Sequence, residues 1–171
     1  MLIDALTGFT PTLLFVFGGL LLIMTVGVAH FDVTELRIPN VLNAALFICG
    51  LVQLAFLATA TGRSFVTMLG VGLGSSILTA SVFFLVREVH YRLRGKVGLG
   101  LGDVKMAGAL APWVHPANIS LVILAACLGA LIYVLFARRT AHFRSRSGRV
   151  PFGAFLGLGL VIIWVFERVS T

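Results

Sequence analysis

Two aspartates are the residues of this sequence best suited to chemistry. The chain has only six acidic residues, and Asp32 and Asp103 each adjoin an apolar block at the same predicted side of a membrane. An ionisable side chain is costly to keep near lipid, so such a residue is a functional candidate. Two carboxylates that face each other cannot both ionise easily, so the pKa of one rises and the pair shares a proton.

A shared proton is what peptide hydrolysis by two carboxyl groups requires. One carboxylate takes a proton from water while the protonated partner donates a hydrogen bond to the scissile carbonyl. The histidines are scattered along the chain and accompany no nucleophilic serine, and Cys49 and Cys127 lack the spacing of a metal site or a disulfide framework. We therefore expect no metal and no other cofactor.

The elements that position the aspartates are membrane helices. The sequence is 59% hydrophobic and 11% charged, whereas soluble domains carry about 25% charged residues. Apolar blocks of a length suited to a core of ~30 Å predict an all-α polytopic membrane protein, one domain over residues 1–171 with six transmembrane helices. The predicted helices are Thr12–Phe31, Pro39–Ala60, Phe65–Val86, Gly102–Val114, Ala117–Ala137 and Phe152–Phe166. The fourth is too short to span unless it begins near Val97.

Basic residues favour one orientation of these helices. With six crossings, eleven of the thirteen basic residues lie on one side, and only Arg63 and Arg168 lie on the other. The eleven are Arg37, Arg87, Arg92, Arg94, Lys96, Lys105, Arg138, Arg139, Arg144, Arg146 and Arg149. Such a bias marks the cytoplasmic side, so we expect both termini in the periplasm and the protein in the bacterial inner membrane. It also accounts for the net charge of +7 without nucleic-acid binding.

Turn-forming residues surround both aspartates. The segment from Asp32 to Asn40 is predicted to be a tight loop, with Pro39 in the first turn of the following helix. Gly100 and Gly102 allow a close backbone approach beside Asp103. The pairs Gly70-x-x-x-Gly74 and Gly153-x-x-x-Gly157 are typical of closely packed membrane helices.

Three segments together resemble the type IV prepilin peptidases, the GxGD membrane aspartic proteases. They are Asp32 with Ile38-Pro39-Asn40, Gly100-Leu101-Gly102-Asp103-Val104-Lys105, and Pro151-Phe152-Gly153. The resemblance implies that Asp32 and Asp103 are the catalytic pair. It implies further that Gly100, Gly102, Pro39, Asn40, Pro151 and Gly153 shape the active site. Glu35 and Lys105 are not expected to be catalytic, and Lys105 is expected to be an interfacial anchor.

The resemblance implies a hydrolase that removes the basic leader from type IV prepilins or pseudopilins at the cytoplasmic face. The expected partners are that substrate, lipid, and proteins of pilus or secretion assembly. The longer family members have an N-terminal cytoplasmic domain with paired cysteines, associated with N-methylation. This sequence resembles the short forms of tight-adherence (Flp-type) systems, so neither that domain nor a methyltransferase activity is expected.

Other functions remain open at this level. A small proton-coupled transporter could use the two aspartates as a relay, although transporter sites usually lie near the midplane of the bilayer. A non-catalytic scaffold for pilus assembly is a second alternative. A presenilin-type protease shares GxGD, but its Pro-Ala-Leu element is missing here, whereas Ile38-Pro39-Asn40 is present.

Overall fold

The computed structural model describes residues 11–96, 98–137 and 150–170, and within these it is helical with no strand. Its helices are α1 (Pro11–Glu35), α2 (Asn40–Thr61), α3 (Phe65–Arg94), α4 (Leu101–Leu110), α5 (Ile119–Ala137) and α7 (Phe152–Val169), with 3₁₀ turns η2 (Ala111–Trp113) and η3 (Pro116–Asn118). All of these helices except α4 lie in segments long and apolar enough to cross a membrane. The all-α membrane class is therefore confirmed, with five candidate spans.

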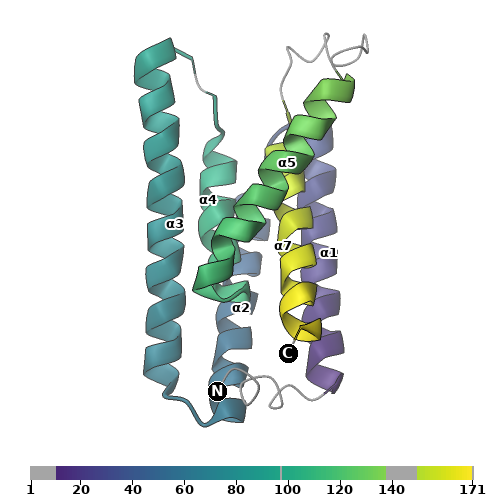
Figure 1. Cartoon of the computed structure of the whole chain (residues 1–171), viewed down its shortest axis with the longest axis vertical. Coiled ribbons are helices and arrows are strands. Elements are labelled where there is room, and N and C mark those ends of the chain that lie inside the picture. Colours follow the sequence, from purple (N-terminus) through teal and green to yellow (C-terminus); the bar gives the residue numbers. More distant parts are fainter. Residues whose placement is uncertain (1–10, 97, 138–149, 171) are drawn as a thin grey trace.

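Successive helices alternate in direction along one long axis (Figure 1). The C-terminal ends of α1 and α3 and the N-terminal ends of α2, α4 and α7 consequently meet at one end of the molecule, which contains Asp32 and Asp103 and is called the aspartate end below. The described members of the eleven basic residues that were expected on one side belong to this end, whereas Arg63 and Arg168 belong to the far end. The cluster from Arg138 to Arg149 lies outside the described residues.

Local sequence explains several helix ends. Gly62 ends α2 and Gly95 ends α3, both in the left-handed conformation, with φ of 63° and 65°. Glycine adopts this conformation without steric cost. The side chain of Ser64 caps α3 by accepting a hydrogen bond from the N–H of Thr67. Short connections of this kind keep α2 and α3 antiparallel neighbours.

The prediction that Asp32 begins a loop is wrong. Helix α1 continues to Glu35, so Asp32 lies inside its last turns, and only residues 36–39 connect it to α2. The apolar pattern stops earlier than the helix because the final turn carries polar side chains, where the hydroxyl of Thr34 bonds the backbone oxygen of His30. Pro39 precedes α2 as its N-cap residue and is not inside its first turn.

Helix α4 is shorter than predicted. It has 10 residues and begins at Leu101, so it does not extend back toward Val97, which lies outside the described residues. Ten residues rise only about 15 Å. The chain continues through η2 and η3 and turns back into α5 before reaching the level at the far end where α3 begins (Figure 1). Residues 106–114 are buried, and irregular backbone at membrane depth is tolerated where protein covers it.

Small residues bring the last helix close to its neighbours. Helix α7 packs against both α1 and α5. A Cβ on Gly157 would lie 3.2 Å from Thr25 Cβ, and one on Gly159 only 2.7 Å from the backbone oxygen of Val122. The packing prediction for Gly153 and Gly157 is thus confirmed. That for Gly70 and Gly74 is wrong within the described chain, because nothing lies within 4 Å of either Cβ position.

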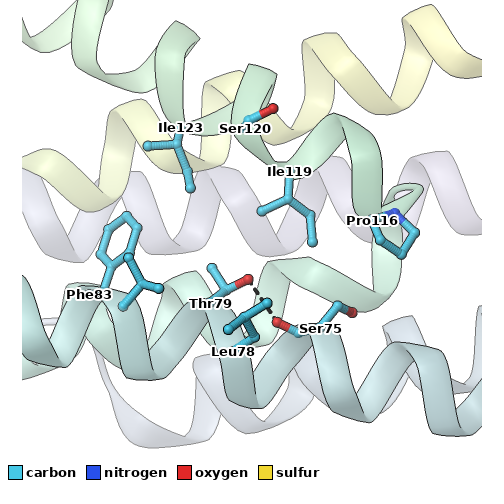
Figure 2. A pocket seen from close by; sticks show the side chains of 9 residues that line it. Ser75, Leu78, Thr79, Phe83, Pro116, Ile119, Ser120 and Ile123 are labelled. Atoms are coloured by element: carbon cyan, nitrogen blue, oxygen red, sulfur yellow. Dashed lines mark hydrogen bonds between the residues drawn. The ribbon is translucent and has the colours of Figure 1, made fainter.

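A lateral groove of about 270 Å³ separates α3 from the start of α5 (Figure 2). Leu78 and Phe83 of α3 face Ile119 and Ile123 across it. The hydroxyl group of Thr79 in its wall already donates a hydrogen bond of 2.7 Å to the backbone oxygen of Ser75. The groove is therefore an apolar surface whose polar atoms are satisfied.

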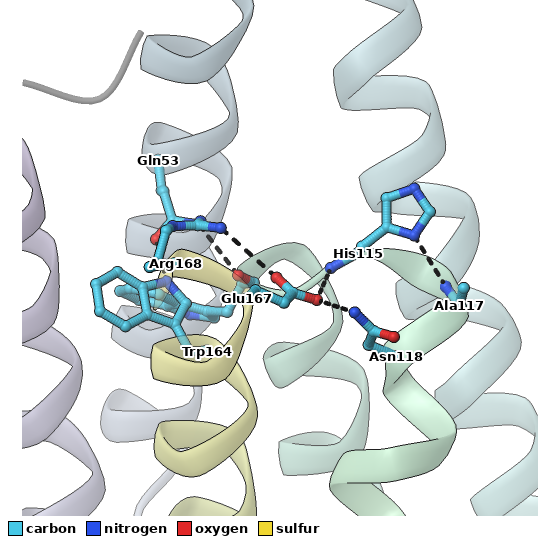
Figure 3. A network of polar contacts seen from close by, with 8 residues as sticks. Gln53, His115, Ala117, Asn118, Trp164, Glu167 and Arg168 are labelled. Carbon is cyan, nitrogen blue, oxygen red and sulfur yellow. Dashed lines mark hydrogen bonds and ion pairs between the residues drawn. The ribbon is translucent and has the colours of Figure 1, made fainter. Parts of the chain in front are cut away.

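A buried polar network holds the α4–α5 turn at the far end (Figure 3). Gln53 of α2 donates to the backbone oxygen of Trp113 at 3.1 Å and accepts from the indole N–H of Trp164 at 2.9 Å. Glu167 of α7 accepts from the backbone N–H of His115 and the side chain of Asn118, at 2.8 and 2.7 Å. The turn between α4 and α5 is therefore fixed to both α2 and α7.

Candidate active site

Asp32 reaches from α1 to the first turn of α7. Its side chain is only 5% exposed, and its Oδ2 accepts a hydrogen bond of 3.0 Å from the backbone N–H of Ala154. The backbone N–H of Gly153 also bonds this carboxyl group. The first N–H groups of a helix have no partner within the helix, so they form a ready site for an anion.

Asp103 is the third residue of α4 and caps that helix. Its Oδ2 accepts a hydrogen bond of 3.2 Å from the backbone N–H of Gly100, the N-cap residue. Gly153 donates its backbone N–H to this carboxyl group as well. The capping contact fixes the direction of the Asp103 side chain at the start of the helix.

The two carboxylates converge on Gly153. A Cβ on this glycine would lie 3.0 Å from Asp32 Oδ2 and 3.4 Å from Asp103 Oδ1. Three helices that are distant in sequence, α1, α4 and α7, thereby place two acids around one backbone position. The structure therefore brings together Asp32 and Asp103, the two residues predicted to form a pair.

Burial raises the pKa of Asp103 to about 6, and the negative charge of Asp32 contributes in the same direction. Hydrogen bonds from the backbone N–H groups of Gly100 and Gly153 oppose the rise. A carboxyl group with such a pKa keeps its proton at a pH where an ordinary aspartate has lost it. The pair can therefore hold one proton, as acid–base chemistry by two carboxyl groups requires.

The predicted shaping residues lie around the pair. Ile38 is buried beside the pair. A Cβ on Gly153 would lie 2.5 Å from Ile38 Cδ1, and a Cβ on Gly102 would lie 3.4 Å from Ile38 Cβ. Both glycines are thus needed for close approach of the α1–α2 connection. Pro39, the N-cap residue of α2, and Asn40, the first residue of that helix, follow Ile38 directly.

Two further residues that were predicted to shape the site lie at the N-terminal ends of helices. Pro151 is buried and is the N-cap residue of α7, which places Gly153 and Ala154 in the first helical turn. Gly100 is the exposed N-cap residue of α4. Both helix starts direct backbone N–H groups at the aspartates.

Sequence reasoning missed two contributors to the site. Ala154 acts through its backbone N–H alone, which no side-chain motif reveals. Asn43 is buried in α2, and its Nδ2 donates to the backbone oxygen of Gly102 at 3.4 Å. Asn43 could have been recognised as an amide side chain that lies one helical turn after Asn40, inside an apolar block.

Other polar residues stay apart from the pair. Lys105 is exposed and its Nζ donates to Asn40 Oδ1 at 2.8 Å, while Glu35 is exposed at the end of α1. Cys49 and Cys127 are free thiols. Within the described ranges, no three His, Cys, Asp or Glu side chains are grouped so that they could hold a metal ion.

Comparison with known proteins adds one finding. Residues 15–135 match the model of the type IV leader peptidase family, a stretch that contains both aspartates and the glycines beside Asp103. No curated protein and no solved structure matches the chain.

Proposed function

This chain belongs to the type IV leader peptidase family, and we propose that it is a membrane aspartic endopeptidase that removes the basic leader from type IV prepilins or pseudopilins. The observation that carries the proposal is the convergence of Asp32 and Asp103 on Gly153. A peptidase family and a carboxyl pair able to share a proton support the same reaction. The Flp type of pilin is the substrate that we propose, because the sequence resembles the peptidases of tight-adherence systems.

We propose distinct roles for the two acids. Asp103, whose pKa is raised to about 6, is the carboxyl group that carries the shared proton and donates to the scissile carbonyl. Asp32, held by the N–H groups at the start of α7, is the ionised partner that takes a proton from the attacking water. Water adds to the carbonyl carbon, and the amine leaves with a proton from the pair.

Membrane topology supports cleavage at the cytoplasmic face of the inner membrane. The described basic residues gather at the aspartate end, which the positive-inside tendency assigns to the cytoplasm. In this orientation the hairpin of the short helix α4 and helix α5 begins and ends on the cytoplasmic side, and the proposed topology puts the start of α1 and the end of α7 on the periplasmic side. A prepilin whose hydrophobic segment lies in the bilayer presents its leader junction at this same end.

Cleavage of a purified prepilin in detergent micelles tests the proposal. We expect the wild type to release the leader, and Asp32→Asn and Asp103→Asn each to lower the rate by about a thousandfold or more. Glu35→Gln is the matched control, because this acid lies in the same last turns of α1 but is exposed. Normal processing by either aspartate variant contradicts the mechanism. Proton flux through liposomes without any cleavage would favour the transporter instead.

A further inference from the structure

A second groove, of about 400 Å³, lies between α2, α3 and α4. Its deeper walls are apolar or small and include Phe47, Ile77 and Ala80. At the aspartate end its wall is polar, formed by Asn40 and Asn43 from the first turns of α2 and by Lys105 of α4. We call it the Asn43 groove.

Asn43 has a hydrogen-bond acceptor with no partner. The residue is only 5% exposed, and its Nδ2 faces the backbone oxygen of Gly102. Its Oδ1 is buried and accepts no hydrogen bond. A buried acceptor without a donor costs about 1–3 kcal/mol, so such an atom in a groove indicates a missing ligand group that donates.

Lys105 provides the complementary donors. Its Nζ uses one N–H on Asn40 Oδ1, at 2.8 Å, and an ammonium group has three. No acidic side chain of the described chain pairs with it. The groove thus offers one acceptor and spare donors close together above an apolar floor.

The groove is linked to the aspartate pair through the first residues of α4. Gly102, whose oxygen holds Asn43, immediately precedes Asp103. Ile38 lies against the Cβ positions of both Gly102 and Gly153, and the Cβ position of Gly153 lies against both acids. The start of α4 has glycine at its N-cap, Gly100, and at its second residue, Gly102, so it lacks two side chains that would obstruct a peptide crossing it.

We propose, resting on the proposed function, that the Asn43 groove binds the unwound segment of the prepilin next to the scissile bond. Asn43 Oδ1 accepts a backbone N–H of that segment, and Lys105 donates to a backbone carbonyl. A helix must be unwound to enter a peptidase site, and its freed polar groups are costly at membrane depth unless the protein pairs them. The groove supplies one partner of each kind.

Two observations favour a peptide in this groove. A lipid phosphodiester could pair with Lys105, but it carries only acceptors and leaves Asn43 Oδ1 unpaired. The groove between α3 and α5 contains no unpaired hydroxyl of this kind, because those of Ser75, Thr79 and Ser120 already donate to backbone oxygens. Figure 2 shows the bond from Thr79 to Ser75.

Filling the groove tests the proposal without touching the acids. Ala44 is exposed and lines the groove, so Ala44→Trp should raise the apparent KM for prepilin about tenfold while kcat stays within about threefold. Asn43→Leu, which removes the acceptor, should also raise KM by about fivefold to tenfold. Ala60→Trp, an exposed position on α2 that lines neither groove, is the matched control and should leave both constants unchanged. An unchanged KM in Ala44→Trp overturns the proposal.

Photocrosslinking identifies the occupant directly. A photoreactive residue at Ala44 in the Asp32→Asn background should capture prepilin within a few residues of the leader junction, as mapped by mass spectrometry. Adducts with phospholipid only, or prepilin captured from Leu78 but not from Ala44, overturn the assignment. The two hypotheses fail separately, because a wild type that never cleaves prepilin refutes the function, whereas cleavage that is indifferent to the groove refutes only this inference.

Discussion

Asp32 and Ala154, which are 122 positions apart, are joined by a hydrogen bond of 3.0 Å from the backbone N–H of Ala154 to Asp32 Oδ2. The bond connects the end of α1 to the start of α7. Helix α7 therefore holds the carboxyl pair through its backbone, although neither acid belongs to this helix.

Removing this N–H should impair catalysis more than folding. Ala154 is the third residue of α7, where proline is tolerated because the N–H has no partner in the helix. Ala154→Pro should therefore lower kcat for prepilin roughly tenfold or more, since Asp32 loses a hydrogen bond to a charged group. Ala154→Ser keeps the N–H and should resemble the wild type. Equal kcat values for the two variants would show that the bond is unimportant.

A side chain at Gly153 should disrupt the site. Its Cβ would lie 2.5 Å from Ile38 Cδ1 and 3.0 Å from Asp32 Oδ2, so the acids must move apart. Gly153→Ala is expected to lower kcat by about a hundredfold, the effect typical of misplacing catalytic groups by about 1 Å. Gly19→Ala meets nothing within 4 Å and should keep full activity, which separates local displacement from a general helix effect.

The proton affinity of Asp103 should depend on Asp32. In Asp32→Asn the neighbouring charge is gone, so the pKa of Asp103 should fall below about 6. It should stay above 3.8, because burial is the larger cause of the rise. The infrared band of the protonated carboxyl group, followed against pH, measures this value. A pKa that does not move would mean that the two carboxyl groups do not interact.

The same rise makes folding stability depend on pH. Because the folded protein holds the Asp103 proton more tightly than the unfolded chain, this contribution is fully present below pH 3.8 and is lost as pH rises through about 6. The loss is at most about 3 kcal/mol. Asp103→Asn should flatten the pH dependence of thermal unfolding in detergent between these values. A wild type that gains stability over this range relative to the variant would reverse the sign and refute the assignment.

The far end should respond to Gln53. Gln53→Leu leaves the carbonyl of Trp113 and the indole N–H of Trp164 without their partner, at a cost of about 2–4 kcal/mol in unfolding free energy. Thermal unfolding in detergent should show the loss. Thr59→Val, an exposed change on the same helix, should alter stability by less than about 0.5 kcal/mol. A Gln53→Leu protein as stable as this control would mean that the network is dispensable.

Sequence predicted the acids better than the elements that carry them. The spacing of apolar blocks placed Asp32 and Asp103 at one end because alternation of membrane helices leaves few other arrangements. The end of α1 was predicted wrongly. Apolar composition indicates which residues contact lipid, whereas the helix continues past the last apolar residues to Glu35. The length of α4 was also misjudged, because its burial depends on tertiary neighbours that a hydropathy pattern does not contain.

The contribution of α7 to the site could be recognised only in part. Gly153 belongs to one of the three sequence motifs, so a place near the active site was expected. Why this residue is glycine becomes clear only from the structure, where a side chain would meet Ile38 and both carboxylates. Asn43 and Gln53 were visible as amides inside apolar segments. Their partners, the backbone oxygens of Gly102 and Trp113, are about 60 positions away and become known only from the fold.

The dependence of both acids on Gly153 and Ala154 also bears on biosynthesis. A growing chain that has emerged as far as the end of α5 already carries Asp32 and Asp103 but not the N–H groups that hold them. The site is therefore assembled only when the final helix has been released from the ribosome and has entered the bilayer. On the proposed function, protein still being inserted and any product truncated before α7 should show no peptidase activity.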